Sequence, residues 1–211
     1  MDIPPDEEGN TRKGDIKDAP CYCHITKSSE NIWHINYLFF YPYNADIVDK
    51  GSLIEATKGS SSFKPNSPYA LGSHEGDWEY FAIEYNENEG EIKRTFYSAH
   101  SSEGKWYKQG NYPVDETTGQ PIIYVANKSH ANYTTLGDHD RTVNILGIKI
   151  NIPADQTSNQ GFQWNCLNRL EFLHQTQPKW LDFNGRWGRF DDPDFLPFGK
   201  PPSGPATKGY W

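Results

Sequence analysis

Glycine and proline recur along the whole chain and limit the length of any regular element. The 211 residues include 18 glycines and 15 prolines. Because glycine suits turns and proline interrupts helices and interior strands, this frequency predicts many short elements joined by turns. Aromatic residues supply 15% of the chain, whereas hydrophobic residues as a whole reach only 35%. Trp and Tyr bury large surfaces, so an aromatic core can compensate for the scarcity of Leu and Val.

Segments rich in aromatic and β-branched residues predict the strands. The polar turn 86–91 is expected to join two of them into a hairpin. One helix is expected over 165–175, where Leu167, Leu170 and Leu173 recur at helical spacing. The pattern predicts a mainly β chain, a single-domain β-sandwich with long loops and one or two short helices. The expected strands are 32–41 (ended by Pro42), 77–85, 92–99, 121–126 and 143–152.

The length suits one domain with tails. Residues 1–23 are predicted to form a flexible N-terminal arm, because the first 20 are charged and rich in Pro and Gly. Residues 24–190 are predicted to form the sandwich, and the Pro- and Gly-rich tail 191–211 to run extended over its surface. The first residues lack the basic and apolar regions of a signal peptide, and the location stays open, with secreted and peripheral membrane as the alternatives.

The net charge of −8 argues against a nucleic-acid partner, because neutralising phosphates requires clustered Lys and Arg. It is compatible with binding cations, neutral sugars, or lipids through a bridging metal. No run of about 18 apolar residues occurs, so no transmembrane segment is expected.

The three cysteines are Cys21, Cys23 and Cys166. A zinc site would require a second pair, which is missing. Two alternatives remain open: one disulfide from Cys166 to either Cys21 or Cys23, or three reduced thiols.

The most informative stretch is 71–79. If a strand begins near Asp77, the two-residue period of side chains places Asp77 and Glu79 on one face and directs Trp78 into a core on the other. Gly72 and Gly76 permit a backbone turn that would fold His74 back beside the two carboxylates.

His74, Asp77 and Glu79 together predict a metal site. One histidine and two carboxylates, completed by water, suit a divalent cation, and oxygen-rich ligands favour Ca, Mg or Mn over Zn. The cation would also relieve the repulsion between the two carboxylates. The alternative is an acidic strand edge with a surface histidine.

Further histidines follow predicted strands or lie in loops, as a site at one end of a sandwich would require. Each is a possible metal ligand, or a residue that orients one, and each could equally be a hydrogen-bonded structural residue. The candidates are His100, His130 and the loop cluster Asp138, His139 and Asp140, whereas His24, His34 and His174 are interpreted as structural.

Four segments together resemble the vacuolar protein sorting-associated protein 62-related family. They are the glycine-bearing stretch 72–79, the aromatic stretch 36–43, the Tyr-Val-Ala-x-x-Ser-His-Ala pattern at 124–131, and Trp187-Gly188. The resemblance covers about residues 30–190, and it implies no particular activity.

The stretch 73–79 also has a more distant similarity to necrosis- and ethylene-inducing peptide-like proteins, the secreted cytolysins of plant-associated microbes. Their heptapeptide, Gly-His-Arg-His-Asp-Trp-Glu, matches at His74 and at the closing Asp77-Trp78-Glu79. The resemblance implies that these positions help bind a divalent cation in a β-sandwich pocket that recognises a glycosphingolipid head group. Ser73, Glu75 and Gly76 depart from the pattern, which weakens the implied lipid specificity more than the metal pocket.

Three functions are compatible with these observations. The first is metal-dependent recognition of a membrane lipid head group or glycan, as part of a toxin or cytolysin, with Trp106 and Tyr107 as aromatic contacts or core residues. The second is a metal-assisted hydrolase of phosphoesters, lipids or glycosides, with His100 or His130 as general acid or base. No G-x-S-x-G nucleophile motif is present, and whether the chain is an enzyme stays open. The third is a trafficking or scaffold domain.

Overall fold

The computed structural model of the chain describes residues 14–15, 18–45, 73–100, 104–145, 148–188 and 201–207. Strands dominate these residues, and the helices among them span only three or four residues each. The predicted mainly β class with short helices is therefore confirmed. In the same residues, no helix has the length and apolar character needed to cross a membrane.

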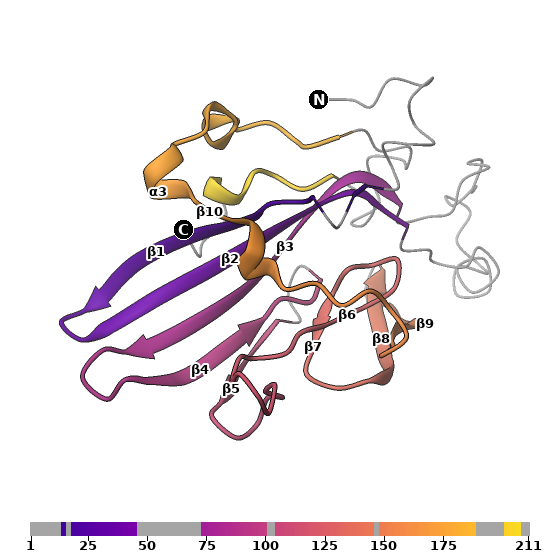
Figure 1. Cartoon of the computed structure of the whole chain (residues 1–211). Coiled ribbons are helices and arrows are strands. Elements are labelled where there is room, and N and C mark those ends of the chain that lie inside the picture. Colours follow the sequence, from indigo (N-terminus) through magenta and orange to yellow (C-terminus); the bar gives the residue numbers. More distant parts are fainter. Residues whose placement is uncertain are drawn as a thin grey trace.

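Six strands form one large sheet, in the order β10-β1-β2-β3-β4-β5 (Figure 1). Neighbouring strands run antiparallel, except that β10 lies parallel to β1. The sheet begins at Cys21, so the last three residues of the predicted arm 1–23 belong to a strand. The strands are β1 (Cys21–Ser29), β2 (Ile32–Asn44), β3 (His74–Asn86), β4 (Glu91–Tyr97), β5 (Lys105–Lys108) and β10 (Leu170–Phe172).

The central strands β2, β3 and β4 confirm the three predicted strands 32–41, 77–85 and 92–99, and the turn between β3 and β4 is the predicted one. The prediction that Pro42 ends the first of them is wrong, because β2 continues to Asn44. Proline has no N–H to give to the ladder, and the pairing passes over Pro42 and resumes where Tyr43 lies opposite Glu75.

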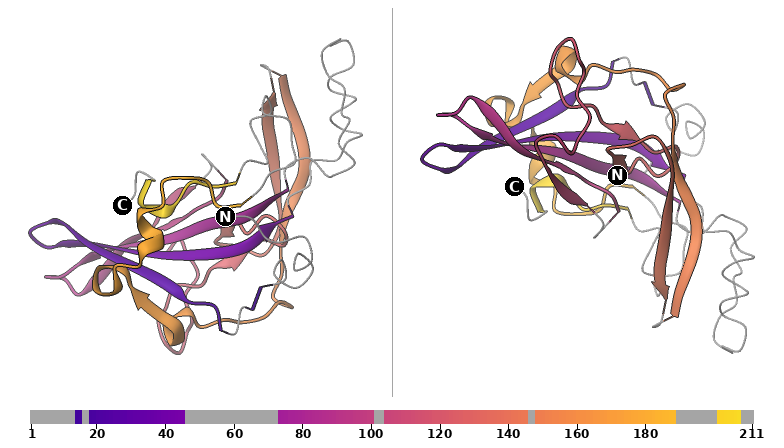
Figure 2. Two further views of the ribbon diagram at one scale, coloured as in Figure 1. Left: turned by 90° about the horizontal axis from the view of Figure 1, so that it is seen from above. Right: turned by 90° about the horizontal axis from the view of Figure 1, so that it is seen from below.

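Four further strands form two small sheets. β6 (Tyr124–Val125) pairs with β7 (Asn132–Tyr133), and β8 (Gly137–Ile145) pairs with β9 (Ile148–Thr157). Figure 2 shows that the β8–β9 hairpin stands away from the large sheet at one of its ends.

Two strand predictions from this region need correction. The predicted strand 121–126 is reduced to the two residues of β6, because its partner β7 is equally short, and one isolated bridge joins Pro121 to Val114. The predicted strand 143–152 is divided between β8 and β9, which form a hairpin. Apolar alternation continues on both sides of a turn, so periodicity alone did not reveal the break.

The predicted helix 165–175 is wrong. The 3₁₀ helix η1 (Cys166–Arg169) comes first, then strand β10, and then α3 (Leu173–Thr176). Residues of β10 pair in parallel with Cys21, Tyr22 and Cys23, so pairing with a distant strand overrides the helical spacing of the leucines. Two more 3₁₀ helices follow, η2 (Lys179–Asp182) and η3 (Pro205–Thr207).

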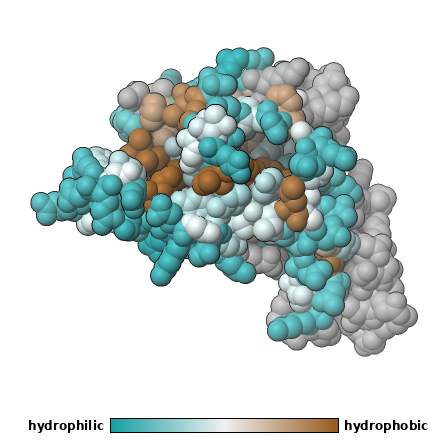
Figure 3. All heavy atoms as spheres, turned by 60° about the horizontal axis from the view of Figure 1, so that its bottom comes forward, coloured by the Kyte–Doolittle hydropathy of each residue, from teal (hydrophilic) through white to brown (hydrophobic). Residues whose placement is uncertain are grey.

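The large sheet is covered on both faces. Figure 1 shows α3 and the last described segment on one side of the sheet and β6 and β7 on the other, and Figure 3 shows hydrophobic surface gathered near the middle of the latter side. The face away from α3, called the first face, buries Cys21, Phe39, Phe81, Ile83 and Tyr97, with Trp164, Cys166 and Leu170 packed against them. The second face buries Leu38, Trp78 and Leu173, with Trp180, Leu181 and Trp187 packed against them.

The last described segment lies against the second face. Pro201 and Pro205 are fully buried, and Arg186 donates from Nη1 to the carbonyl oxygen of Pro201 across 2.7 Å. Most of the predicted arm 1–23 and of the predicted tail 191–211 lies outside the described residues.

Candidate functional site

The candidate site lies where the first face of the sheet changes from apolar to acidic. Towards the C-terminal end of β3, this face carries Phe81 and Ile83, and towards its N-terminal end it carries Asp77 and Glu79. On the neighbouring strand β2, Glu79 lies opposite Phe39 and Asp77 lies opposite Tyr41. Both carboxylates are buried, at 9% and 7% exposure. This confirms the prediction that Asp77 and Glu79 share a face and that Trp78 points into a core on the opposite one.

Asp77 is held by an imidazole and an amide. Its Oδ2 accepts hydrogen bonds from Nδ1 of His130 at 3.0 Å and from Nδ2 of Asn44 at 3.3 Å. The His130 ring is stacked on Tyr41, with centroids 3.9 Å apart and planes within 3°. Burial, followed by the carboxylates of Glu79 and Asp77, raises the pKa of Tyr41 far above its usual range, so this phenol is neutral.

Glu79 is held from the neighbouring strand. The hydroxyl of Ser98 donates to Oε2 of Glu79, and the Ser98 oxygen accepts from the backbone N–H of Tyr80 and from Nδ2 of Asn132, both at 3.0 Å. Burial and the adjacent Glu79 raise the pKa of Tyr80 to about 12. The Glu79 carboxylate therefore contacts a fixed hydroxyl at the start of the loop that leads to His100.

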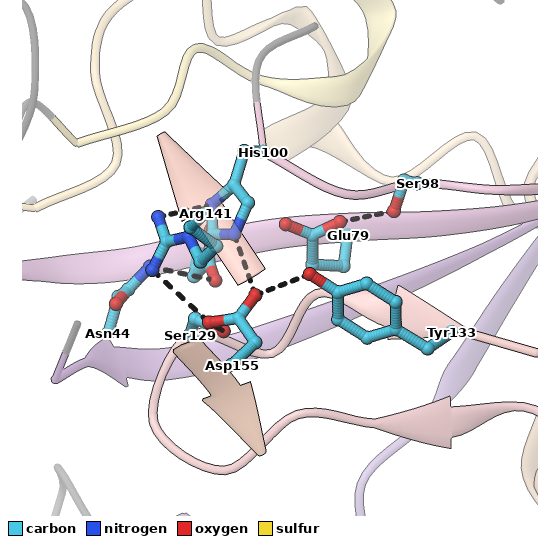
Figure 4. A network of polar contacts seen from close by, with 9 residues as sticks. Asn44, Glu79, Ser98, His100, Ser129, Tyr133, Arg141 and Asp155 are labelled. Atoms are coloured by element: carbon cyan, nitrogen blue, oxygen red, sulfur yellow. Dashed lines mark hydrogen bonds and ion pairs between the residues drawn. The ribbon is translucent and has the colours of Figure 1, made fainter. Parts of the chain in front are cut away.

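A third buried carboxylate, Asp155 of β9, gathers four donors around it (Figure 4). It connects the β8–β9 hairpin to the loops that follow β4 and β6. The donors are Nε2 of His100 at 2.8 Å, the hydroxyls of Ser129 at 2.8 Å and Tyr133 at 2.6 Å, and Nη1 of Arg141 at 3.1 Å.

These contacts keep Asp155 ionised. Burial alone would raise the pKa of its carboxyl, but the hydrogen bonds from His100 and Tyr133, together with the charge of Arg141, lower that pKa to about 2. Arg141 also donates from Nη2 to Nδ1 of His100 at 3.1 Å. Both ring nitrogens of His100 are thus engaged.

The backbone around the site is strained. Four non-glycine residues in the described ranges have positive φ, and three of them lie here: His100 at 43°, Lys128 at 75° and His130 at 60°. Residues other than glycine adopt this left-handed region at a cost of about 1–3 kcal/mol each, and such residues cluster at functional sites. In these backbone conformations the imidazole of His100 contacts Asp155 and the imidazole of His130 contacts Asp77.

His74 does not reach the carboxylates in the way that its spacing suggested. It lies within β3, and its Nδ1 is 2.7 Å from the carbonyl oxygen of Gly76. Gly76 has a φ of 68°, and a Cβ on it would lie 2.1 Å from the carbonyl oxygen of Trp187. Gly76 therefore meets both the predicted backbone requirement and a packing requirement against Trp187. His130, not His74, supplies the imidazole on Asp77. Gly72 lies outside the described residues.

The predicted cluster of Asp138, His139 and Asp140 is not a loop but part of strand β8. His139 Nε2 lies 3.1 Å from Oγ1 of Thr157, and its ring stacks on Tyr133 at 3.6 Å. Asp138 and Asp140 are exposed. His139 thus supports Tyr133, which binds Asp155. Among the described residues, no contact joins either aspartate to the site.

Sequence reasoning missed Asp155, Arg141, Tyr133, Ser98 and Asn44. None of them lies in a glycine-bearing motif like the stretch 71–79. The one available signal was the pattern at 124–131, which contains Ser129 and His130. Of the predicted residues, the structure brings Asp77, Glu79, His100 and His130 to one end of the sheet. Within the described part of the chain, no three His, Cys, Asp or Glu side chains lie close enough to share a metal ion.

Solved structures with some likeness include NLPPya in complex with glucosamine (TM-score 0.36, 14% identity, 76% of this chain and 54% of that one). They also include the non-toxic HaNLP3 protein (TM-score 0.36, 17% identity, 77% and 55%). A third is Necrosis and Ethylene inducing Protein 2 from the causal agent of cocoa's witches' broom disease (TM-score 0.36, 13% identity, 76% and 53%).

Among sequences, Vacuolar protein sorting-associated protein 62 of Saccharomyces cerevisiae is 24% identical over 203 residues, which cover 83% of this chain and 38% of the yeast protein. The chain therefore spans less than half the length of this relative. The family model described as Vacuolar protein sorting-associated protein 62 matches residues 1–191, almost the whole chain. The chain belongs to the vacuolar protein sorting-associated protein 62 family.

Proposed function

We propose that this chain is a recognition module that binds a divalent cation at Asp77 and Glu79 and, through the cation, a membrane lipid head group or a glycan. The observation that carries the proposal is a pair of acceptor atoms at the Asp77 end of this acidic face, Oδ1 of Asp77 and Nε2 of His130. Both hydrogen bonds to Asp77 end on Oδ2, and among the described residues Oδ1 accepts none. His130 uses Nδ1 on Asp77, and no described residue contacts its Nε2 by a hydrogen bond.

The donor atoms fit a hard or borderline divalent ion. Carboxylate oxygens are the ligands that Ca²⁺, Mg²⁺ and Mn²⁺ prefer, and imidazole nitrogen suits Mn²⁺ and Zn²⁺. The carboxylate of Asp77 holds the His130 ring so that Nε2 keeps its lone pair, an orientation that metal-binding histidines commonly use. Asp77 and Glu79 would hold the cation, and His130 would orient the Asp77 carboxylate through its hydrogen bond to Oδ2. The bound cation would supply charge for a phosphate or for sugar hydroxyls.

The His100 side chain has a different part in this proposal. Both of its ring nitrogens are engaged by Asp155 and Arg141, so binding a metal would break a contact to a buried charge. His100 and Asp155 therefore shape the loops around the site, whereas Nε2 of His130 has no hydrogen bond to a described residue.

The first test is a calorimetric titration of chelator-treated protein with Ca²⁺, Mg²⁺ and Mn²⁺ in turn. One ion is expected to bind in a one-to-one ratio, and both Asp77→Asn and Glu79→Gln are expected to weaken it at least tenfold. Glu89→Gln, in the exposed turn after β3, is the matched control and should bind like the parent. Absence of binding by the parent, or equal binding by all variants, would refute the cation site.

The second test separates the two ligand sources. The loaded protein is mixed with phosphatidylcholine vesicles that contain either an anionic phospholipid or a glycosphingolipid, and with soluble neutral oligosaccharides. Binding that is lost with a chelator and in Asp77→Asn supports the proposal, and the arm that binds identifies the head group. Binding that persists without the cation would contradict it.

A hydrolase is the second candidate, and the Asp77–His130 pair is the observation that favours it. A carboxylate-held imidazole with an open Nε2 is the arrangement of a general base acting on water. Phosphodiester or glycoside turnover that requires the cation and is lost in His130→Gln would support this function, and turnover unchanged by that substitution would exclude it.

A further inference from the structure

Two cysteines distant in the sequence meet at the edge of the large sheet. Cys21 opens β1 and is fully buried in the core with Phe39 and Phe81. Cys166 opens η1, is half-buried, and packs against the same core. The parallel register that places Cys21 beside Leu170 holds η1 next to the start of β1. The two side chains form a thiol–thiol hydrogen bond, and neither cysteine is in a disulfide.

The segment that carries Cys166 connects the two faces of the sheet. Cys166 and Leu170 pack on the first face, whereas Leu173 is buried in the core of the second. The chain therefore passes around the β1 edge within a few residues, as Figure 1 shows for η1, β10 and α3. A disulfide between Cys166 and Cys21 would fix this segment covalently to β1.

We propose that Cys21 and Cys166 are a dithiol modification site that reacts with low-molecular-weight disulfides and closes to an intramolecular disulfide. The proposal is independent of the cation site. Cys23, two residues along β1 and also buried, is not part of the pair.

The two thiols have different roles in the reaction. The hydrogen bond from Cys21 lowers the pKa of Cys166 against the effect of its burial, and the same contact, with burial, raises the pKa of Cys21 far above its usual range. Cys166, the more accessible of the two, is thus the attacking thiolate, and Cys21 remains protonated until the second step. Burial and the neighbouring Cys166 raise the pKa of Cys23 to about 11, which makes it a poor nucleophile.

The Cys166 thiolate attacks one sulfur of the reagent disulfide, forms a mixed disulfide, and releases one reagent thiolate. Cys21 then loses its proton and attacks the sulfur of Cys166, which forms the Cys21–Cys166 bond and releases the second reagent thiolate. The two protein thiols are oxidised, and one reagent disulfide is reduced to two thiols.

The experiment treats the folded protein with oxidised glutathione, blocks remaining thiols with an alkylating agent, and maps the peptides by mass spectrometry. The parent is expected to yield a Cys21–Cys166 cross-linked peptide with Cys23 alkylated, and a melting temperature raised by the cross-link and restored by reductant. Cys166→Ser should give no cross-link. Cys21→Ala should accumulate one glutathione on Cys166.

Cys23→Ser is the matched control and should cross-link like the parent, with circular dichroism confirming that each variant is folded. A cross-link that includes Cys23, glutathione that stays on Cys166 of the parent, or thiols that react only after denaturation would each overturn the proposal.

Discussion

Arg141 donates from Nη2 to Nδ1 of His100 across 3.1 Å, although both groups can carry a positive charge. A guanidinium has no acceptor atom, so Nδ1 is the acceptor in this contact and Nε2 carries the proton that the ring donates. That proton points at Oδ2 of Asp155, 2.8 Å away. Asp155 therefore holds Arg141 and His100 side by side.

Replacing the buried guanidinium should be costly. Arg141→Met removes the partner of a buried carboxylate and is expected to lower the free energy of unfolding by about 3 kcal/mol, measured by urea denaturation. Arg169→Met is the control, because Arg169 pairs with Asp18 at the exposed surface and should cost less than about 1 kcal/mol. Equal losses in the two variants would contradict the assigned role of Arg141.

Asp155→Asn should make stability less dependent on acid. The pKa of Asp155 is lowered from 3.8 to about 2 on folding, so its ionised form stabilises the protein at every pH above 3.8 by about 2 kcal/mol. This contribution is lost as the pH falls through about 2. The variant is therefore expected to be less stable than the parent at pH 7, and the difference should shrink between about pH 4 and pH 2. A constant difference across that window, in urea unfolding series, would disagree with a depressed pKa.

Gly76 tests the close packing between β3 and the C-terminal segment. In Gly76→Ala the new Cβ would meet the Trp187 carbonyl oxygen at 2.1 Å and hold a φ of 68°. We expect a loss of about 3 kcal/mol or more in unfolding free energy, from the clash added to the backbone strain. Gly110→Ala has a φ of 84° with nothing within 4 Å, so it reports the strain alone, about 1 kcal/mol. Similar losses at both positions would show that packing at Gly76 is loose.

Trp78 tests the assignment of the second face as a core. Trp78→Ala would remove a side chain that contacts Phe40, Trp180 and Trp187, and it is expected to cost about 3–5 kcal/mol. Trp106→Ala, on the edge strand and 40% exposed, should cost about 1 kcal/mol. Thermal and urea denaturation of both variants measure the difference, and an equally mild effect of the two would refute the burial of Trp78.

The local pattern of the chain was enough to predict its class and its central hairpins. Aromatic and β-branched residues in β2 and β3 favour strands. The turn 86–91 makes hydrogen bonds of its own, from the N–H groups of Asn88, Glu89 and Gly90 to Asn86. The two-residue period alone placed Asp77 and Glu79 together and Trp78 opposite, because the pleat leaves no other arrangement.

Elements that depend on a distant partner could not be predicted in this way. Residues 170–172 have helical spacing but form β10, because β1 offers a parallel edge only in the folded chain. Residues 121–126 have strong strand propensity but pair over two residues, since their partner β7 is short. Propensity measures the preference of a segment, and ladder hydrogen bonds from elsewhere decide the outcome.

The site divides in the same way. The acidic face of β3 follows from its own alternation, and the sequence by itself determined it. Only the tertiary structure decided that His130, and not the nearby His74, would hold Asp77, and that Asp155 would collect His100 and Arg141. Those contacts join residues up to 55 positions apart. They exist because burying each carboxylate requires donors from whichever loops lie beside it, and no local pattern records which loops those are.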